Sequence, residues 1–332
     1  MIMKKTAVLF LTAILAVAIT SCHKEEKVET PKQGYTLMEK ATAPQFSGEN
    51  AYSLVEKQVS FGPRNPNSDA HQKAKEFFEN ELKKYADEVE LQNFSYAGYN
   101  AEKLDLTNII AKFNPSSKNR IFICAHWDCR PRADQDKIEK NKTLPIPGAN
   151  DGASGCGIII ELARLLKENK INYGVDLVLF DGEDYGRESD LENYCLGSKY
   201  FATNVPENYK PYFGILLDLV GDKEAVFRKE GNSMQAIPDV VNMIWSIAGK
   251  IDAKTFADIE GSAIYDDHIP LNQVGLATVD IIDEDLVGAH SKIERRNYWH
   301  TQGDNMDNIS KETLQQVGSV LAKLIYSLKF NS

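Results

Sequence analysis

Two apolar runs joined by an amphipathic segment stand at the centre of the hydrophobic pattern. Residues 121–125 are continuously apolar, which is typical of a strand buried on both faces. Residues 152–168 carry apolar side chains at helical spacing, and residues 175–180 form the next buried run. A strand, a crossover helix and a second strand are expected to be parallel and right-handed. The pattern therefore predicts a βαβ unit over residues 121–180.

Further elements are predicted on both sides of this unit. A helix is expected over residues 69–86, where Ser68 is a suitable N-cap and apolar residues recur at helical spacing. The other predictions are extended segments at 88–97 and 105–113, strands at 212–220 and 276–282, and helices at 233–250 and 311–328, the last capped by Ser310. No repeat, low-complexity block or Gly-rich linker follows residue 46, so we expect one α/β domain over residues 47–332.

The N-terminal segment has the pattern of a targeting signal. Two lysines precede an apolar run over residues 7–19, which is too short to span a bilayer as a helix but fits the core of a signal peptide. The run ends at Ser21-Cys22, which resembles the lipobox of bacterial lipoproteins; a plain secretory signal with a chance cysteine is the alternative. We therefore expect a lipoprotein signal peptide over residues 1–21 and a flexible tether over 22–46. The protein would be anchored through Cys22 to a bacterial membrane, either in the periplasm or exposed at the surface.

Composition and charge exclude several classes of protein. Of the 332 residues, 42% are hydrophobic and 26% are charged, values of a globular protein and not of a disordered, collagen-like or multi-span membrane chain. The net charge of −10 makes nucleic acid an unexpected partner, because phosphate binding needs clustered Lys and Arg. Five cysteines are too few for a disulfide scaffold of this length. Cys124 and Cys156 are expected to be buried and to pack like small apolar side chains. Cys129 and Cys195 fall in predicted loops near the site, and their spacing leaves open whether they form a disulfide.

Acidic and imidazole side chains follow the ends of the predicted strands. They are His126, Asp128, Asp151, Asp181, Glu183, Asp184, Asp218, Asp280 and His300. Ligands of open α/β sheets bind beyond the carboxyl ends of the strands, so we expect these groups at one edge of the sheet. So many like charges need a cation or raised pKa values, and His with carboxylates favours an open zinc site with three protein ligands. Taken singly, Asp151 has the alternative of a helix cap, Asp184 of a turn residue and His300 of a core histidine.

The order of these motifs resembles that of the zinc-dependent glutaminyl cyclases, the glutaminyl-peptide cyclotransferases of the zinc aminopeptidase-like fold. The matching stretches are His126-Trp127-Asp128, Pro147-Gly148-Ala149-Asn150-Asp151-Gly152-Ala153, Phe180-Asp181-Gly182-Glu183-Asp184, Leu216-Leu217-Asp218-Leu219-Val220-Gly221, Tyr265-Asp266-Asp267-His268-Ile269-Pro270 and Trp299-His300-Thr301. The first two are shared with zinc aminopeptidases, whereas the last two look more like the cyclases. The resemblance implies a three-layer α/β/α sandwich around a central mixed, mostly parallel sheet.

The resemblance also implies the metal ligands. Asp151, Asp184 and His300 match the three ligands of one zinc ion per chain. Animal cyclases have Glu where Asp184 stands, so the ligand type is kept with a side chain one methylene shorter.

The remaining site residues are implied in the same way. Glu183 matches the general acid/base, and Asp218 and Asp266 match acids that form a hydrogen-bonded network with it. Trp299 matches the aromatic side chain that packs against the substrate. Asp280 stands where animal cyclases have a histidine and is expected at the substrate site.

These roles imply cyclisation of peptides or proteins with an N-terminal glutamine. The α-amine attacks the side-chain amide carbon, a five-membered lactam closes and ammonia leaves, with zinc polarising the amide and Glu183 moving the proton. We expect a monomer that meets the membrane only through the lipid on Cys22. Two alternatives stay open. One is a zinc aminopeptidase with a second zinc on His126 and Asp218, and the other is a surface lipoprotein that keeps the fold only for binding.

Overall fold

A six-stranded mixed sheet forms the centre of the computed structural model, which describes residues 34–38 and 40–331. Its strands, in spatial order, are β2 (Glu88–Ala97), β3 (Lys103–Phe113), β5 (Gly174–Phe180), β4 (Arg120–His126), β6 (Gly214–Asp218) and β9 (Thr278–Ile282). Strands β5, β4, β6 and β9 run parallel to one another, while β3 is antiparallel to both of its neighbours. The predicted mixed, mostly parallel sheet is confirmed.

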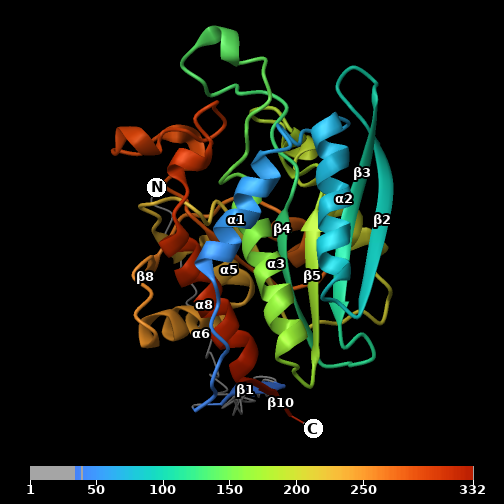
Figure 1. Ribbon diagram of the computed structural model, residues 1–332, viewed down its shortest axis with the longest axis vertical. Helices are drawn as coiled ribbons and strands as arrows, with labels where there is room; N and C mark the ends of the chain where they lie inside the picture. Colours follow the sequence, from blue (N-terminus) through green and yellow to red (C-terminus); the bar gives the residue numbers. More distant parts are fainter. Residues whose placement is uncertain (1–33, 39, 332) are drawn as a thin grey trace, which may run out of the picture. The chain divides into compact units, whose positions relative to one another are not determined.

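Helices cover both faces of this sheet (Figure 1). One face packs against α1 (Gly48–Val59), α2 (Asp69–Lys83), α3 (Ala153–Glu168), α6 (Pro238–Lys250) and α8 (Lys311–Ser327). The other face packs against α4 (Leu196–Asn204) and α7 (His268–Gln273). Strand β4 contributes to both layers by alternation, since Ile121 and Ile123 join the first core cluster and Phe122 and Cys124 the second. The three-layer sandwich is therefore confirmed.

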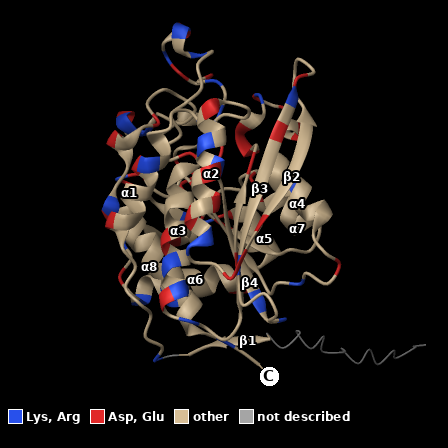
Figure 2. Ribbon diagram, turned by 45° about the vertical axis from the view of Figure 1, so that its right-hand side comes forward, with Lys and Arg blue, Asp and Glu red and all other residues tan. Residues whose placement is uncertain are grey.

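Short elements complete the described chain. They are β1 (Tyr35–Leu37), β10 (Leu328–Phe330), β7 (Phe227–Lys229), β8 (Phe256–Glu260), α5 (Gly231–Ala236) and 3₁₀ turns at Glu139–Asn141, Glu183–Tyr185, Leu191–Asn193, Val287–Ala289, Glu294–Arg296 and Met306–Asn308. Both basic and acidic residues lie on α1 and α2 in Figure 2. No helix in the described ranges combines the length and hydrophobicity that crossing a bilayer requires.

The helix predicted over residues 233–250 is in fact two helices. Helix α5 ends at Ala236 and α6 begins at Pro238, with Ile237 between them in an extended conformation at φ −152° and ψ 64°. The proline ring clashes with a helical conformation of the residue before it, so the break falls at Ile237. Pro238 then starts the second helix, where its missing N–H is not needed.

Part of the segment predicted to be a flexible tether belongs to the domain. Strand β1 pairs antiparallel with β10 at the lower end of the sheet in Figure 1, whereas the loop over residues 127–150 rises at the upper end. Tyr35 is buried against Phe213, and Phe46 is buried in the main core. The prediction is therefore wrong for the described part of residues 34–46. The signal peptide and Cys22 lie outside the described residues.

Candidate metal centre and active site

The polar residues that follow the strands do meet at one edge of the sheet. Asp151 lies in the turn before α3, Glu183 and Asp184 follow β5, and Asp218 ends β6. Within the described ranges, three groups of residues each bring their ligand atoms within 4.8 Å of one another: Asp151–Asp184–His300, His126–Asp151–Asp218 and Glu183–Cys195–Asp266. The first group is the ligand set implied by the resemblance.

The first group has the geometry and chemistry of a zinc site. His300 Nε2 lies 3.3 Å from Asp184 Oδ1 and 3.7 Å from Asp151 Oδ2, and all three side chains are buried. The second oxygen of Asp184 is buried and has no hydrogen-bond partner among the described residues. One imidazole and two carboxylates with an unpaired oxygen fit the donor set of a catalytic zinc.

Two of the alternatives, a helix cap at Asp151 and a core histidine at His300, lose their support. Gly152, and not Asp151, is the N-cap of α3, and no side chain caps that helix. His300 is held at a φ of +55°, a left-handed conformation that is costly for a residue with a side chain. Such strain is typical of functional sites and gives no benefit to a histidine that only fills the core.

Two buried carboxylates fix the loops that carry the ligands. Asp128 accepts hydrogen bonds from the backbone N–H groups of Glu183 (3.0 Å) and Asp184 (3.3 Å). Asp304 accepts from those of Asn150 (2.8 Å) and Asp151 (3.2 Å). No local pattern indicates this role of Asp304, because its partners lie 154 and 153 positions earlier in the chain.

Arg130 is a further group that the sequence did not assign. Its buried guanidinium donates to Asp184 Oδ1 at 2.7 Å and to both oxygens of Asp134. Burial alone would raise the pKa of Asp184, but the charges of His300 and Arg130 outweigh it and hold that pKa well below its usual range. Asp184 is therefore ionised and ready to bind a cation.

The second group shares Asp151 with the first. His126 Nε2 lies 3.1 Å from Asp151 Oδ1 and 3.2 Å from Asp218 Oδ1. A carboxylate between two ligand sets is the arrangement of a two-metal site. The described residues can therefore accommodate a second ion next to the first.

Glu183 lies beside the metal ligands without belonging to their group. It is 8% exposed, the most accessible member of the third group. Burial, reinforced by the charges of Asp184 and Asp266, raises the pKa of Glu183 well above its ordinary value. Burial and the charge of Asp218 likewise raise the pKa of Asp266 to about 7. A carboxyl group with a raised pKa next to a metal centre is suited to general acid/base catalysis.

The two predicted substrate-binding residues lie differently. Trp299 is half-buried, and its ring stacks on that of His300 with centroids 3.3 Å apart. Asp280 is completely buried, with Oδ2 3.6 Å from His268 Nδ1. Trp299 is accessible enough to contact a substrate, whereas Asp280 is shielded from one in this structure.

Other residues singled out from the sequence have structural partners. Asp181 accepts from His71 Nε2 at 2.8 Å and from the backbone of Thr107, and Trp127 is fully buried and stacks on His71. All four described cysteines are free, so Cys129 and Cys195 do not pair.

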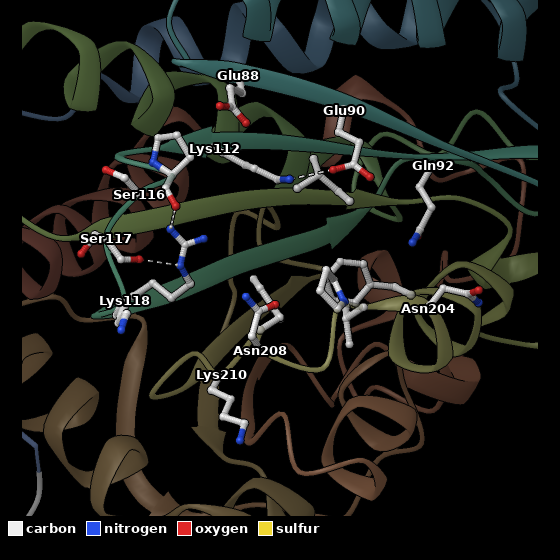
Figure 3. A pocket seen from close by; sticks show the side chains of 17 residues that line it. Glu88, Glu90, Gln92, Lys112, Ser116, Ser117, Lys118, Asn204, Asn208 and Lys210 are labelled. Carbon is white, nitrogen blue, oxygen red and sulfur yellow. Dashed lines mark hydrogen bonds and ion pairs between the residues drawn. The ribbon is translucent and has the colours of Figure 1, made fainter.

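A large hollow in the described chain lies away from this site. A cavity of about 990 Å³ lies between β2, β3 and the segment after α4, at the other end of the sheet (Figure 3). Its rim carries Glu88, Glu90, Lys112, Lys118 and Lys210, and no residue of the three ligand groups lines it. This cavity is therefore separate from the three ligand groups at the strand ends.

Comparison with known proteins agrees with this geometry. The sequence matches the model of peptidase family M28 over residues 108–325. A glutaminyl cyclase of Bacteroides thetaiotaomicron, solved with N-acetylhistamine, is 40% identical, with a TM-score of 0.81 over 86% of this chain and 99% of that one. A leucine aminopeptidase precursor from the same organism gives the same identity, coverage and TM-score.

Curated relatives also carry both activities. The aminopeptidase YwaD of Bacillus subtilis is 25% identical over 213 residues, which are 62% of this chain. A glutaminyl-peptide cyclotransferase of Boiga dendrophila is 23% identical over 250 residues, which are 65% of this chain. The matches span 40% and 63% of the lengths of these two relatives.

Proposed function

Since the chain belongs to peptidase family M28, we propose that it is a glutaminyl cyclase, that is, a glutaminyl-peptide cyclotransferase. Its substrates would be peptides or proteins with an N-terminal glutamine, which it converts to pyroglutamate with release of ammonia. The observation that carries the proposal is the position of Glu183, a buried carboxyl group with a raised pKa, directly beside the three-ligand group Asp151–Asp184–His300. The 40% identity to a glutaminyl cyclase over most of this chain supports it.

The residues divide the work of cyclisation between them. Asp151, Asp184 and His300 would hold one zinc ion, which when bound supplies Lewis-acid polarisation of the glutamine side-chain amide. Glu183 takes a proton from the attacking α-amine and returns it to the departing ammonia. The charge of Asp266, whose own pKa is raised by burial and by Asp218, helps to raise the pKa of Glu183 above its ordinary value for this transfer.

Positioning supplies a further part of the rate. Attack by the amine on the amide of the same residue is intramolecular, and well-oriented reactions of this kind reach effective molarities of about 10⁵ M or more. Trp299, half-buried beside His300, is placed to pack against the substrate and keep water from the carbonyl.

An aminopeptidase is the second candidate, and one observation favours it. The group His126–Asp151–Asp218 can hold a second ion bridged by Asp151, as a two-metal hydrolase requires. Metal analysis of the active protein separates the two functions. One zinc per chain together with ammonia release from a Gln-initiated peptide supports the cyclase, whereas two zinc ions and release of a free amino acid would overturn it.

The location of the protein stays a prediction from the sequence. Cys22 lies outside the described residues, so the lipid anchor rests on the sequence pattern alone. Cys22→Ser is expected to release the protein from membranes, which fractionation and lipid labelling would detect. Unchanged membrane association would refute the anchor. The expected monomer is tested by light scattering on the released protein.

A further inference from the structure

The third ligand group brings a thiol to the two acids beside the metal centre. Cys195 Sγ lies 3.5 Å from Glu183 Oε1, and Asp266 completes the group within 4.8 Å. The backbone fixes this arrangement, because the N–H of Cys195 donates to the carbonyl of Glu183 at 2.9 Å. Cys195 itself is completely buried and is held at a φ of +57°. The backbone therefore holds the thiol of Cys195 next to the carboxyl groups of Glu183 and Asp266.

Several buried carboxyl groups near Cys195 have oxygens without a hydrogen-bond partner among the described residues. Asp266 is 3% exposed; its Oδ1 accepts from the backbone of Asp267, but its Oδ2 is buried without any hydrogen-bond partner among the described residues. One oxygen of Asp267 and both oxygens of Asp280 are also unpaired. The imidazole of His268 lies between two of the acids, with Nδ1 3.6 Å from Asp280 Oδ2 and Nε2 3.4 Å from Glu230 Oε2, outside hydrogen-bonding contact with Asp280. Buried carboxylates in this number need either protons or a cation.

We propose that Glu183, Cys195 and Asp266 form a second cation site, distinct from the zinc centre, that binds a thiophilic divalent ion such as Zn²⁺ or Cd²⁺ and inhibits the enzyme. A thiolate selects soft ions, and two carboxylates complete a three-ligand set for them. Each ion bound displaces one proton from the thiol of Cys195. The bound ion also occupies an oxygen of Glu183, which then cannot carry the proton of the reaction.

The sulfur ligand allows an ion bound at this site to be distinguished by its absorbance from an ion bound at either of the other two ligand groups. Neither Asp151–Asp184–His300 nor His126–Asp151–Asp218 contains a cysteine. An ion that binds to either of them, or that replaces zinc there, gives no sulfur-to-metal charge transfer. Ultraviolet absorption of a cadmium thiolate therefore reports on the third group alone.

The experiment is a titration of the zinc-loaded protein with Cd²⁺, followed by absorbance and by activity. Wild type should show a thiolate band that saturates near one equivalent, with loss of turnover over the same range. Cys195→Ser should lose the band, and Cd²⁺ should no longer lower the turnover that this variant shows in the absence of added ion. Cys129→Ser is the matched control, because Cys129 is equally buried, contacts Ile146 O and belongs to none of the groups.

Two additional measurements keep the test decisive. Glu183→Gln removes a carboxylate ligand without altering the sulfur and should weaken the Cd²⁺ band, which can be measured even though turnover of this variant should be slow. Mg²⁺, which prefers oxygen ligands, should neither compete with Cd²⁺ at equal concentration nor inhibit.

The absence of a thiolate band in wild type would overturn the site, as would a band that survives in Cys195→Ser or disappears in Cys129→Ser. A band without loss of turnover would overturn the inhibition. The inhibitory effect rests on the proposed function, but the band needs no substrate. If the wild-type protein shows the band but has no cyclase activity, the proposed cyclase function is refuted, whereas the proposed cation site is supported.

Discussion

The exchange Glu183→Gln separates metal binding from proton transfer within one loop. Glutamine keeps the shape of the side chain and its ability to hydrogen bond but has no proton to exchange. Glu183 lies outside the group Asp151–Asp184–His300, so the zinc content should stay at the wild-type level. The fold should also be kept, because the backbone N–H of Glu183 still donates to Asp128.

The magnitude follows from the role assigned to this carboxyl group. General acid/base catalysis contributes about 10²–10⁴-fold, so kcat should fall by that factor, which corresponds to about 2.7–5.4 kcal/mol in activation free energy. KM should change little, because the substrate would be held by Trp299 and the metal centre. Burial and the charges of Asp184 and Asp266 raise the pKa of Glu183, which suits this carboxyl group to proton transfer.

The assay combines turnover of a Gln-initiated peptide with zinc analysis on the same sample. Asp184→Ala is the matched comparison, since it alters the neighbouring residue and removes a metal ligand. It should lose zinc and activity together. Nearly full turnover in Glu183→Gln, or loss of zinc in Glu183→Gln while Asp184→Ala retains it, would refute the division of roles between these two acids.

Three other exchanges test separate parts of the account. His300→Ala should remove zinc and activity together, and zinc analysis that finds full occupancy would contradict its role as a ligand. Asp304→Ala leaves the backbone N–H groups of Asn150 and Asp151 without their acceptor and should weaken zinc binding about 10–100-fold in a chelator competition; unchanged affinity would show that the loop holds its shape alone. Phe78→Ala opens a cavity in the main core and should cost about 3–5 kcal/mol in denaturant unfolding while leaving kcat near wild type at low temperature; a loss of kcat in the folded variant would link this core to the site.

The sequence predicted the central elements because their signals are local. The apolar runs of β4 and β5 and the helical spacing of α3 depend on neighbouring residues only, and all three formed as expected. The convergence of Asp151, Glu183 and Asp184 followed from the same reasoning, because parallel strands present their carboxyl ends at one edge.

The features that escaped prediction depend on distant partners. Strand β1 forms by pairing with β10, nearly the whole domain away in the chain, so Tyr35–Leu37 carried no sign of a strand. Asp304 and Arg130 act through contacts with loops that only the fold brings near. The approach of Cys195 to Glu183 results from a turn whose φ of +57° no pattern of residue types indicates.

The central claim is that the site closes a lactam and does not hydrolyse a peptide bond. Two peptides that differ only in their first residue, Gln or Leu, are incubated together with the zinc-loaded protein and followed by mass spectrometry. The account predicts that the Gln peptide loses ammonia and keeps all its residues, while the Leu peptide stays intact, and that Glu183→Gln slows the first change. Removal of the first residue from either peptide, with no loss of ammonia from the Gln peptide, would contradict the account.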